Sequence, residues 1–526
     1  MIVVFALLTL VAALWLVVFF RRGGLIAGCL LVLAAGICLG PHFFHRSLGP
    51  VQISLDRLLW IALIAYYAVA RLTGATVRRP LTRSDLLLGA FYSVVVASVV
   101  AFDYRHADSR PLSQLLFYHL LPLGIYWVAR HAVYTERTVI GMLSGLAVFG
   151  VYLGITAIAE THGLSWLVYP RYIAAADNPE FFGRARGPLM NPAGAGILLG
   201  LCLGASVLLW PKTGRGGRML LGVTAVLLLA GVYSTMTRTA WLGAGLGVVV
   251  IGGLAMPRQL RLPAVAACVL LAGLVGATQW ESLLRFKRDK EQSAADTADS
   301  VKLRPILAVV ALKMFADRPL TGCGFAHYNE AHNQYLEDRP WGLALEKAEP
   351  YIQHNILLSF LVELGLAGAG LFVIVLGLWL REACLIWHDR ERPAWMRQFA
   401  LLFLAFFANY FVNGMFHDVT LIPMVNMVLY FLAGALIAIR QDGERVAYAH
   451  RSESTRQSEW THLVTFLRSR FSAASTKGSS SSRSMISRAA SGENHSRWRH
   501  DSSQASSITV TFMRNMVQRS STPHLR

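Results

Sequence analysis

The chain alternates between long apolar runs and short polar connections. A membrane-spanning α-helix needs about 20 mostly apolar residues. Thirteen runs approach this length, at 2–20, 23–41, 56–72, 85–102, 114–133, 138–158, 192–210, 219–234, 239–256, 263–278, 356–380, 398–415 and 420–439. The pattern predicts an all-α polytopic membrane protein with about 12–13 transmembrane helices. Arg21 and Arg22 follow the first run where a small-residue cleavage site would stand, so we interpret that run as a retained helix.

Composition excludes a soluble protein of several domains. Of the 526 residues, 55% are hydrophobic and 15% are charged, whereas a soluble surface needs about 25% charged residues. The net charge of +19 does not indicate a nucleic-acid partner, because the cytoplasmic loops of membrane proteins collect Lys and Arg. The six cysteines have neither metal-ligand spacing nor the pattern of a disulfide framework.

The connections between the runs alternate in charge. Basic residues follow the odd-numbered runs, as in 71–83, 211–218 and 257–261, whereas a mixed loop such as 103–111 follows the even-numbered ones. The positive-inside rule assigns the basic connections to the cytoplasm. The sequence therefore predicts an N-terminus outside the membrane and a C-terminus in the cytoplasm.

Two segments differ from the predicted transmembrane domain, residues 1–440. The outer loop 279–353 carries 10 basic and 11 acidic residues, and its stretch 301–320 has apolar residues at helical spacing. We expect a folded extracytoplasmic loop whose helix lies along the membrane surface or against the bundle. Residues 441–526 hold 13 Lys and Arg and 6 Asp and Glu among many serines, which predicts a disordered cytoplasmic tail. The alternative for part of it is that residues 460–471 form a basic amphipathic turn or two lying on anionic lipid.

Arginines precede the seventh run, in FFGRARGPLMNPAGAG (181–196). Arg184 and Arg186 supply guanidinium groups, and Asn191 stands where the next helix is predicted to begin. Guanidinium groups and the N–H groups of a helix N-terminus together suit phosphate oxygens. The alternative is that these arginines contact lipid headgroups.

Arg238 is the only charged residue between two apolar runs, in STMTRTAWLGAGLG (234–247). Its predicted position on the outer side runs against the charge bias. An ionisable group near the bilayer is costly unless it is paired or solvated, so Arg238 is a candidate functional residue. The alternative is a side chain that extends to a lipid phosphate.

A histidine precedes the eleventh run, in YIQHNILLSFLVELGLAGAG (351–370). His354 and Asn355 stand at the outer end of the predicted helix, and Glu363 lies about two and a half turns deeper. A neutral imidazole accepts a proton from a hydroxyl at neutral pH. A merely solvated or capping histidine is the alternative, and His332 competes for the role.

These residues together place arginines and a histidine on one predicted face, beside the outer loop. The combination fits a lipid-linked pyrophosphate held by arginines, with a histidine removing the proton from an attacking sugar hydroxyl. No Asp-rich motif accompanies them. We therefore expect arginines rather than a metal ion to neutralise the leaving pyrophosphate.

Four motifs in residues 180–440 resemble the bacterial O-antigen ligase and polymerase superfamily. They are R-x-x-G followed by Asn-Pro (Arg184, Gly187, Asn191, Pro192), S-x-x-[ST]-R-x-A (Ser234, Thr237, Arg238, Ala240), MFADRPLTGCGF (314–325) and HNILLSFLVELGLAG (354–368). The last is similar to the family pattern H-N-x-x-L-x-x-x-x-E-x-G-x-x-G. Family ligases have twelve spans with the N-terminus inside, and an extra first helix would reconcile that with the charge pattern.

The resemblance implies a metal-independent inverting glycosyltransferase of the bacterial inner membrane, without a cofactor. It would move a glycan from undecaprenyl pyrophosphate to an acceptor hydroxyl on the periplasmic face. By the resemblance, Arg184 and Arg238 bind the pyrophosphate and His354 activates the acceptor, with Arg186 and Arg304 as further phosphate candidates. We expect lipid A core as the acceptor. An O-antigen or exopolysaccharide polymerase and a protein O-glycosyltransferase are the alternatives, and a lipid or polysaccharide transporter is the alternative from another class.

Overall fold

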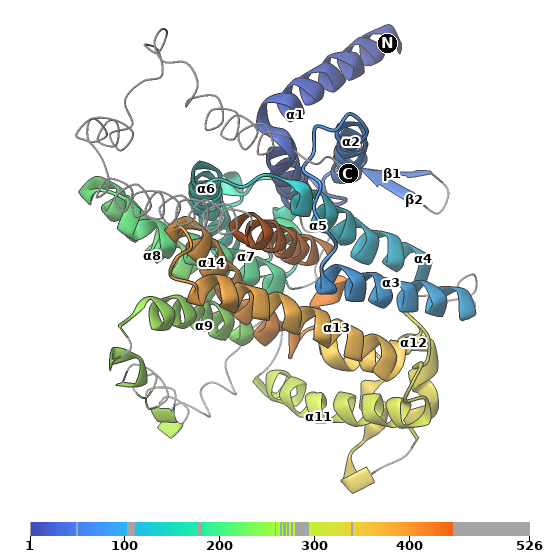
Figure 1. Cartoon of the computed structure of the whole chain (residues 1–526). Helices are drawn as coiled ribbons and strands as arrows, with labels where there is room; N and C mark the ends of the chain where they lie inside the picture. The colour runs from blue at the N-terminus through green and yellow to red at the C-terminus, as the bar shows by residue number, and fades with distance from the viewer. Residues whose placement is uncertain are drawn as a thin grey trace, which may run out of the picture. The chain divides into compact units, whose positions relative to one another are not determined.

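Helices form almost all of the secondary structure in the computed structural model (Figure 1). The structure describes residues 2–444 except 49–50, 103–110, 176–180, 182, 258, most positions of 264–276, 279–293 and 338–339. The predicted tail, residues 441–526, therefore lies outside the described residues from 445 on, whereas residues 441–444 continue the last helix and are not disordered. One short antiparallel hairpin interrupts the helices, formed by β1 (His45–Leu48) and β2 (Val51–Ser54).

The helices follow the apolar runs of the sequence. They are α1 (Ile2–Cys38), α2 (Leu55–Leu72), α3 (Arg83–Ala101), α4 (Pro111–Gln114), a π-turn (Leu115–Leu120), α5 (Leu121–His131), α6 (Glu136–Thr161), α7 (Pro192–Leu209), α8 (Arg215–Ser234), α9 (Arg238–Ala255), α11 (Ala294–Asp317), α12 (Tyr328–Ala331), α13 (Ile356–His388), α14 (Ala394–Gly414) and the C-terminal helix (Pro423–Glu444). Short 3₁₀ turns lie at Ser165–Leu167, Arg171–Ala174, Gly187–Leu189, Trp210–Lys212, His332–Tyr335, Pro340–Gly342, Leu345–Ala348 and Val419–Leu421.

Ten helices in the described part of the chain are long and apolar enough to cross a membrane, which confirms a polytopic helical protein. Three differences separate this number from the thirteen predicted runs. The first two runs form one helix, α1, which bends at Gly24 with φ 68°. Helix α2 carries three charged residues, among them Asp56 and Arg71, and is not one of the ten. The run 263–278 lies largely outside the described residues.

Helix α7 is the centre of the bundle and packs against α6, α8, α9 and α14. Its sequence is rich in Gly and Ala, so neighbouring backbones approach closely. A Cβ on Gly196 would collide with Ala240 of α9, and one on Gly200 would collide with Asn409 of α14. Asn409 donates to the carbonyl of Ile197 over 3.2 Å, which ties α14 to α7.

The described part of the loop 279–353 has its own apolar core. Helix α11 ends at Asp317, before Pro319, and confirms the helix expected in this loop. Its buried residues Leu307, Val310 and Met314 pack with Leu345 from the loop and with Val362 of α13. The apolar face of α11 therefore packs against the loop and the bundle, where Figure 1 draws it beside α13.

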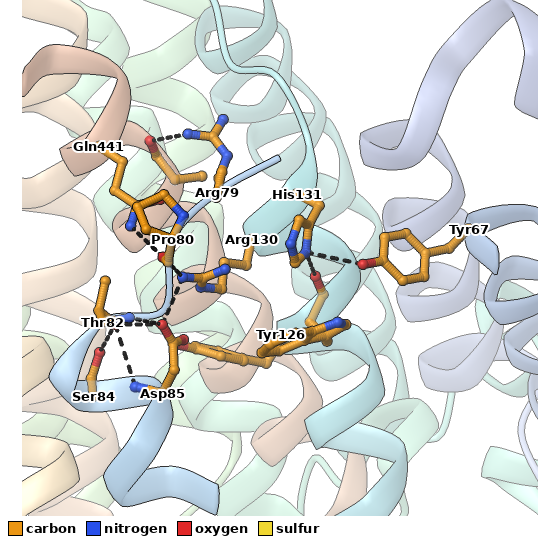
Figure 2. Close-up of polar contacts among 12 residues, drawn as sticks. Tyr67, Arg79, Pro80, Thr82, Ser84, Asp85, Tyr126, Arg130, His131 and Gln441 are labelled. Carbon is orange, nitrogen blue, oxygen red and sulfur yellow. Dashed lines mark hydrogen bonds and ion pairs between the residues drawn. The ribbon is translucent and has the colours of Figure 1, made fainter. Parts of the chain in front are cut away.

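Buried charges close one end of the bundle (Figure 2). Arg79 forms a bidentate ion pair with Asp442 of the C-terminal helix, at 2.7 and 2.8 Å, and its side chain is inaccessible to solvent. Arg130 of α5 pairs with Asp85 of α3 at 2.7 Å, and Tyr126 donates to the same carboxylate over 2.6 Å. We call this region, where α6, α8 and α14 begin, the opposite end. The site end is where these helices finish and α7, α9 and α13 begin.

Candidate functional site

The first two predicted segments contact each other at the site end. The guanidinium of Arg184 donates to the carbonyl of Thr235 over 3.2 Å and to the hydroxyl of Thr237 over 2.6 Å. The backbone N–H of Ala185 donates to the carbonyl of Ser234 over 2.9 Å. These contacts hold Arg184 against the turn between α8 and α9. Arg238 follows Thr237 directly as the first residue of α9.

Arg186 occupies a different environment from Arg184. Its Nε lies 3.0 Å from a carboxylate oxygen of Glu160, and its Nη2 donates to the carbonyl of Ile173 over 2.7 Å. The same carboxylate accepts the backbone N–H groups of Arg186 and Gly187, both over 2.9 Å. Arg186 is 1% exposed, so its charge is neutralised inside the bundle, and the contacts favour a structural role.

Asparagines begin two of the helices at the site end. The Asn191 side chain accepts from the N–H of Gly194 over 3.0 Å and caps α7. Asn355 caps α13 by accepting from Leu357 and Leu358, over 2.9 and 3.0 Å. Its amide also donates to the carbonyl of Met415 over 3.0 Å. Asn355 therefore fixes the start of α13 against the end of α14.

His354 precedes this cap in an uncommon backbone conformation, with φ 47°. The backbone carbonyl of His354 accepts from Nη1 of Arg304 over 3.4 Å, which places α11 beside the histidine. Burial, together with the positive charge of Arg304, lowers the pKa of His354 to about 4. In the described part of the chain, neither ring nitrogen of His354 has a hydrogen-bond partner. The ring is therefore neutral near pH 7 and able to accept a proton.

His332 is held differently from His354. Its Nδ1 lies 3.0 and 3.1 Å from the carbonyls of Asn329 and Tyr328, and its Nε2 lies 3.2 Å from the carbonyl of Glu349. The ring also stacks on Tyr328. Because both nitrogens face carbonyl acceptors, His332 stabilises the outer loop and is a weaker candidate than His354 for proton removal from a substrate.

The motif at 314–325 crosses α13 at its kink. Gly365 has φ 63°, and the N–H groups of Leu366 and Ala367 donate to the carbonyls of Pro319 and Leu320. A little further along, Gly324 donates to the carbonyl of Glu363 over 3.0 Å. A Cβ on Gly365 would collide with the backbone of Leu320. Gly365 and Gly324 therefore allow the backbone of the 314–325 motif to contact the backbone of α13. In addition, the carboxylate of Glu363 accepts a hydrogen bond from the N–H of Ala326 over 3.0 Å.

Two neighbouring residues that the sequence analysis did not single out belong to the same region. Nε2 of His417 lies 3.2 Å from the hydroxyl of Thr239 in the first turn of α9. Asp418 is buried and accepts from the N–H of Thr420 over 3.1 Å. The sequence did carry a signal for them. His417 and Asp418 are adjacent ionisable residues between two apolar runs, and such residues are candidate functional residues.

Unusual backbone conformations concentrate in these segments. Among the described residues, those other than glycine with positive φ are Phe181, Met190, Met236, Ala326 and His354. All lie in the arginine segment, the turn between α8 and α9, the 322–329 segment, or the residues before α13. Such conformations cost free energy and cluster at functional sites. The site end therefore combines arginines, a neutral histidine and strained connections.

One comparison with known proteins identifies a family. Residues 223–373 match the O-antigen ligase family. The match contains Arg238, Arg304, His354 and Glu363, whereas Arg184 precedes it. Comparison with curated proteins finds no match. The chain is thus a polytopic membrane protein that carries an O-antigen ligase family domain over residues 223–373.

Proposed function

We propose that the protein is a metal-independent glycosyltransferase that moves a glycan from undecaprenyl pyrophosphate to an acceptor hydroxyl at the site end. The observation that carries this proposal is the contact of Arg184 with Thr237, one residue before Arg238. This contact holds Arg184 against the N-terminus of α9, whose first residue is Arg238. A pyrophosphate bound there would face guanidinium groups and the positive end of α9.

The reaction needs a single displacement. The acceptor oxygen attacks the anomeric carbon of the donor while the imidazole of His354 takes the hydroxyl proton. The bond between the anomeric carbon and the pyrophosphate oxygen breaks, and undecaprenyl pyrophosphate leaves with both electrons of that bond. Attack from the opposite side inverts the anomeric configuration. Arg184, Arg238 and Arg304 stabilise the negative charge that develops on the leaving group.

The pKa of His354 supports its role as the base, with a limit. A pKa of about 4 keeps the imidazole neutral at pH 7, so it is ready to accept a proton. The same low pKa makes it a modest base. Much of the acceleration must then come from the arginines, which stabilise the negative charge on the leaving undecaprenyl pyrophosphate.

The charge distribution supports an extracytoplasmic site. The opposite end carries arginines such as Arg79, Arg130, Arg392 and Arg440 at the helix ends. Basic ends face the cytoplasm under the positive-inside rule. The site end then faces the periplasm of a bacterial inner membrane, where a lipid-linked glycan and lipid A core would meet.

The acceptor we favour is lipid A core, which would make the reaction O-antigen ligation. Support comes from the family that matches residues 223–373. A deletion strain tests it through the size and attachment of its surface glycans. Full-length glycan stranded on the lipid carrier, with bare lipid A core, supports a ligase. Lipid A core carrying a single repeat identifies a polymerase instead, and loss of glycan from protein identifies a protein glycosyltransferase.

Reconstitution of the whole chain in liposomes tests the chemistry. With lipid-linked glycan and lipid A core, we expect His354→Ala to lose about 10²- to 10⁴-fold in transfer rate, as expected for a missing general base. His162→Ala is the matched control, because His162 is an exposed histidine that follows α6 at the site end. Full transfer by a folded His354→Ala protein would exclude this mechanism.

A transporter predicts a different result in the same vesicles. It would move the lipid-linked glycan across the bilayer without changing its covalent attachment, and it would tolerate His354→Ala. The donor site has its own test in Arg238→Lys, since a lysine cannot reproduce the planar fork of an arginine on phosphate. Arg171→Lys, at an exposed position, is the control. Unchanged donor affinity in Arg238→Lys would remove Arg238 from the site.

A further inference from the structure

A small polar cavity of about 80 Å³ lies at the site end, next to the proposed base. It is bounded by the π-turn before α5, the segment 325–329, the first turns of α13 and the loop after α14. Its lining residues are Gln114, His119, Phe325, Ala326, Tyr328, Asn329, Ile352, Gln353, Ser359, Phe360, Glu363, Asp418, Thr420 and Leu421. A volume of this order accommodates a few oxygen-sized groups.

Two carboxyl groups face this cavity without a cationic partner in its lining. Glu363 accepts from the backbone N–H of Ala326, and Asp418 accepts from the backbone and hydroxyl of Thr420. Burial raises the pKa of Asp418 above its ordinary value. No Lys or Arg is among the described residues that line the cavity. The cavity therefore disfavours phosphate and offers hydrogen-bond acceptors to a ligand that donates.

Two further polar atoms in the lining have no protein partner. The side-chain carbonyl of Gln353 and the hydroxyl of Tyr328 are buried and make no hydrogen bond within the described structure. The two residues are 4% and 2% exposed. A buried polar group without a partner costs about 1–3 kcal/mol. Both residues line the same cavity, so one ligand with hydroxyl groups would be placed to satisfy these atoms together.

The walls of the cavity also suit a sugar. Phe325 and Phe360 each meet the ring of His119 edge to face, with centroids 5.1 and 6.0 Å apart. Aromatic walls with a few polar groups are typical of small-molecule sites. The apolar C–H groups of a sugar can lie against such rings while its hydroxyls reach the carboxylates.

The chain connects this cavity to both halves of the proposed reaction. Gln353 directly precedes His354. Asp418 directly follows His417, whose ring contacts Thr239 beside Arg238. The cavity is thus linked to the proposed base by adjacent residues of the chain. It is linked to the proposed phosphate site through the contact of His417 with Thr239. The two carboxyl groups lie at this cavity, whereas Arg184 and Arg238 lie at the turn between α8 and α9.

We propose that this cavity binds hydroxyl groups of the acceptor sugar and orients the attacking hydroxyl toward His354. The inference rests on the proposed function and adds the location of the acceptor subsite. Gln353 and the carboxylates accept hydrogen bonds from the sugar, and Tyr328 either donates or accepts. The lipid-linked pyrophosphate stays on the arginine side, because no Lys or Arg among the described lining residues of the cavity would neutralise its negative charge.

Tyr328→Phe and Gln353→Met test this subsite. Each removes a buried polar atom that has no protein partner, the Tyr328 hydroxyl or the Gln353 side-chain carbonyl, and the second also removes the side-chain NH₂ group. A purely structural role predicts an unchanged or higher melting temperature and unchanged kinetics. The subsite predicts a KM for lipid A core raised about 2- to 12-fold in each variant, the loss of one hydrogen bond. Tyr335→Phe, in the same loop but bonded to Asp317 outside the cavity, is the control with wild-type KM.

Donor kinetics separate failure of the subsite from failure of the function. In both variants we expect an unchanged KM for the lipid-linked donor and unchanged inhibition by undecaprenyl pyrophosphate. An unchanged acceptor KM in folded variants, or a raised donor KM, would overturn the subsite while the wild-type chain still transfers glycan. A wild-type chain that transfers no glycan to any acceptor overturns the proposed function itself.

Discussion

Nε2 of His417 lies 3.2 Å from the hydroxyl of Thr239, across 178 residues of chain. This contact joins the loop after α14 to the first turn of α9. Because Thr239 follows Arg238, the contact positions the helix end at which the pyrophosphate is proposed to bind. His417 is in this sense a positioning residue, not a proposed catalytic one.

Removal of the Thr239 hydroxyl tests this positioning. Thr239→Val preserves shape and loses the contact, so we expect the donor KM to rise about 2- to 12-fold, equivalent to one hydrogen bond. The transfer rate at saturating donor should change less. Steady-state kinetics in liposomes measure both, with Thr213→Val at the opposite end as control. Wild-type donor KM in Thr239→Val would show that the contact does not position the site.

The low pKa of His354 predicts a change in pH dependence when Arg304 is replaced. Arg304 lowers the pKa in addition to burial, so Arg304→Gln should raise it toward the ordinary value of about 6.5. The imidazole must be neutral to act as a base. The wild-type rate should therefore fall only as the pH approaches about 4, whereas the acid limb of the variant should lie at higher pH. Burial, the larger cause, still keeps the variant pKa below the ordinary value of about 6.5.

Rate profiles across this pH range measure the effect. Lys313→Gln is the control, because this substitution also removes one positive charge from α11. Lys313 lies nine residues beyond Arg304 in the same helix. A profile for Arg304→Gln that parallels the wild type would separate Arg304 from His354. The sign matters, since a shift of the acid limb to lower pH would also contradict the assignment.

Replacement of Gly365 tests the crossing of the outer loop over α13. Alanine would face a positive φ, which costs about 1–2 kcal/mol, and its Cβ would collide with the backbone of Leu320. Gly365→Ala should therefore lower the melting temperature in detergent. Gly370→Ala is the control on the same helix, because nothing lies within 4 Å of a Cβ there. Equal melting temperatures for the two variants would remove this role of Gly365.

The sequence predicted the helical membrane fold because apolar runs have a direct physical meaning in a bilayer. Its thirteen runs exceed the ten candidate spans of the described residues partly where charge and length were ambiguous, as in α2 and in the two runs joined at Gly24. Arg184 and Arg238 were both recognised as candidates, and their proximity comes from hydrogen bonds between loops. Pattern alone does not reveal such contacts.

Other features of the site depended on three-dimensional contacts. The ion pair of Arg186 with Glu160 distinguishes it from Arg184, although the two arginines stand two residues apart. Glu160 ends an apolar run and has no motif around it. The cavity at Glu363 likewise requires Tyr328, Gln353 and Asp418, which come from three separate segments.

The ion pair at the opposite end gives a stability prediction. Asp442→Ala would leave Arg79 buried without its carboxylate, which costs about 3–5 kcal/mol. Glu444→Ala is the control, because the pair of Glu444 with Arg440 is exposed and worth about 0–1 kcal/mol. Unfolding in detergent should separate the two variants clearly. A loss of stability no larger in Asp442→Ala than in Glu444→Ala would contradict the role of the buried pair.

The pairing of Arg79 with Asp442 also has a consequence for biogenesis. Arg79 is synthesised 363 residues before its carboxylate partner. Until the C-terminal helix inserts, the nascent chain carries an arginine whose burial is not compensated. A chain that stops before residue 442 would lack the carboxylate that neutralises Arg79. The pair thereby forms only after the C-terminal helix has been synthesised.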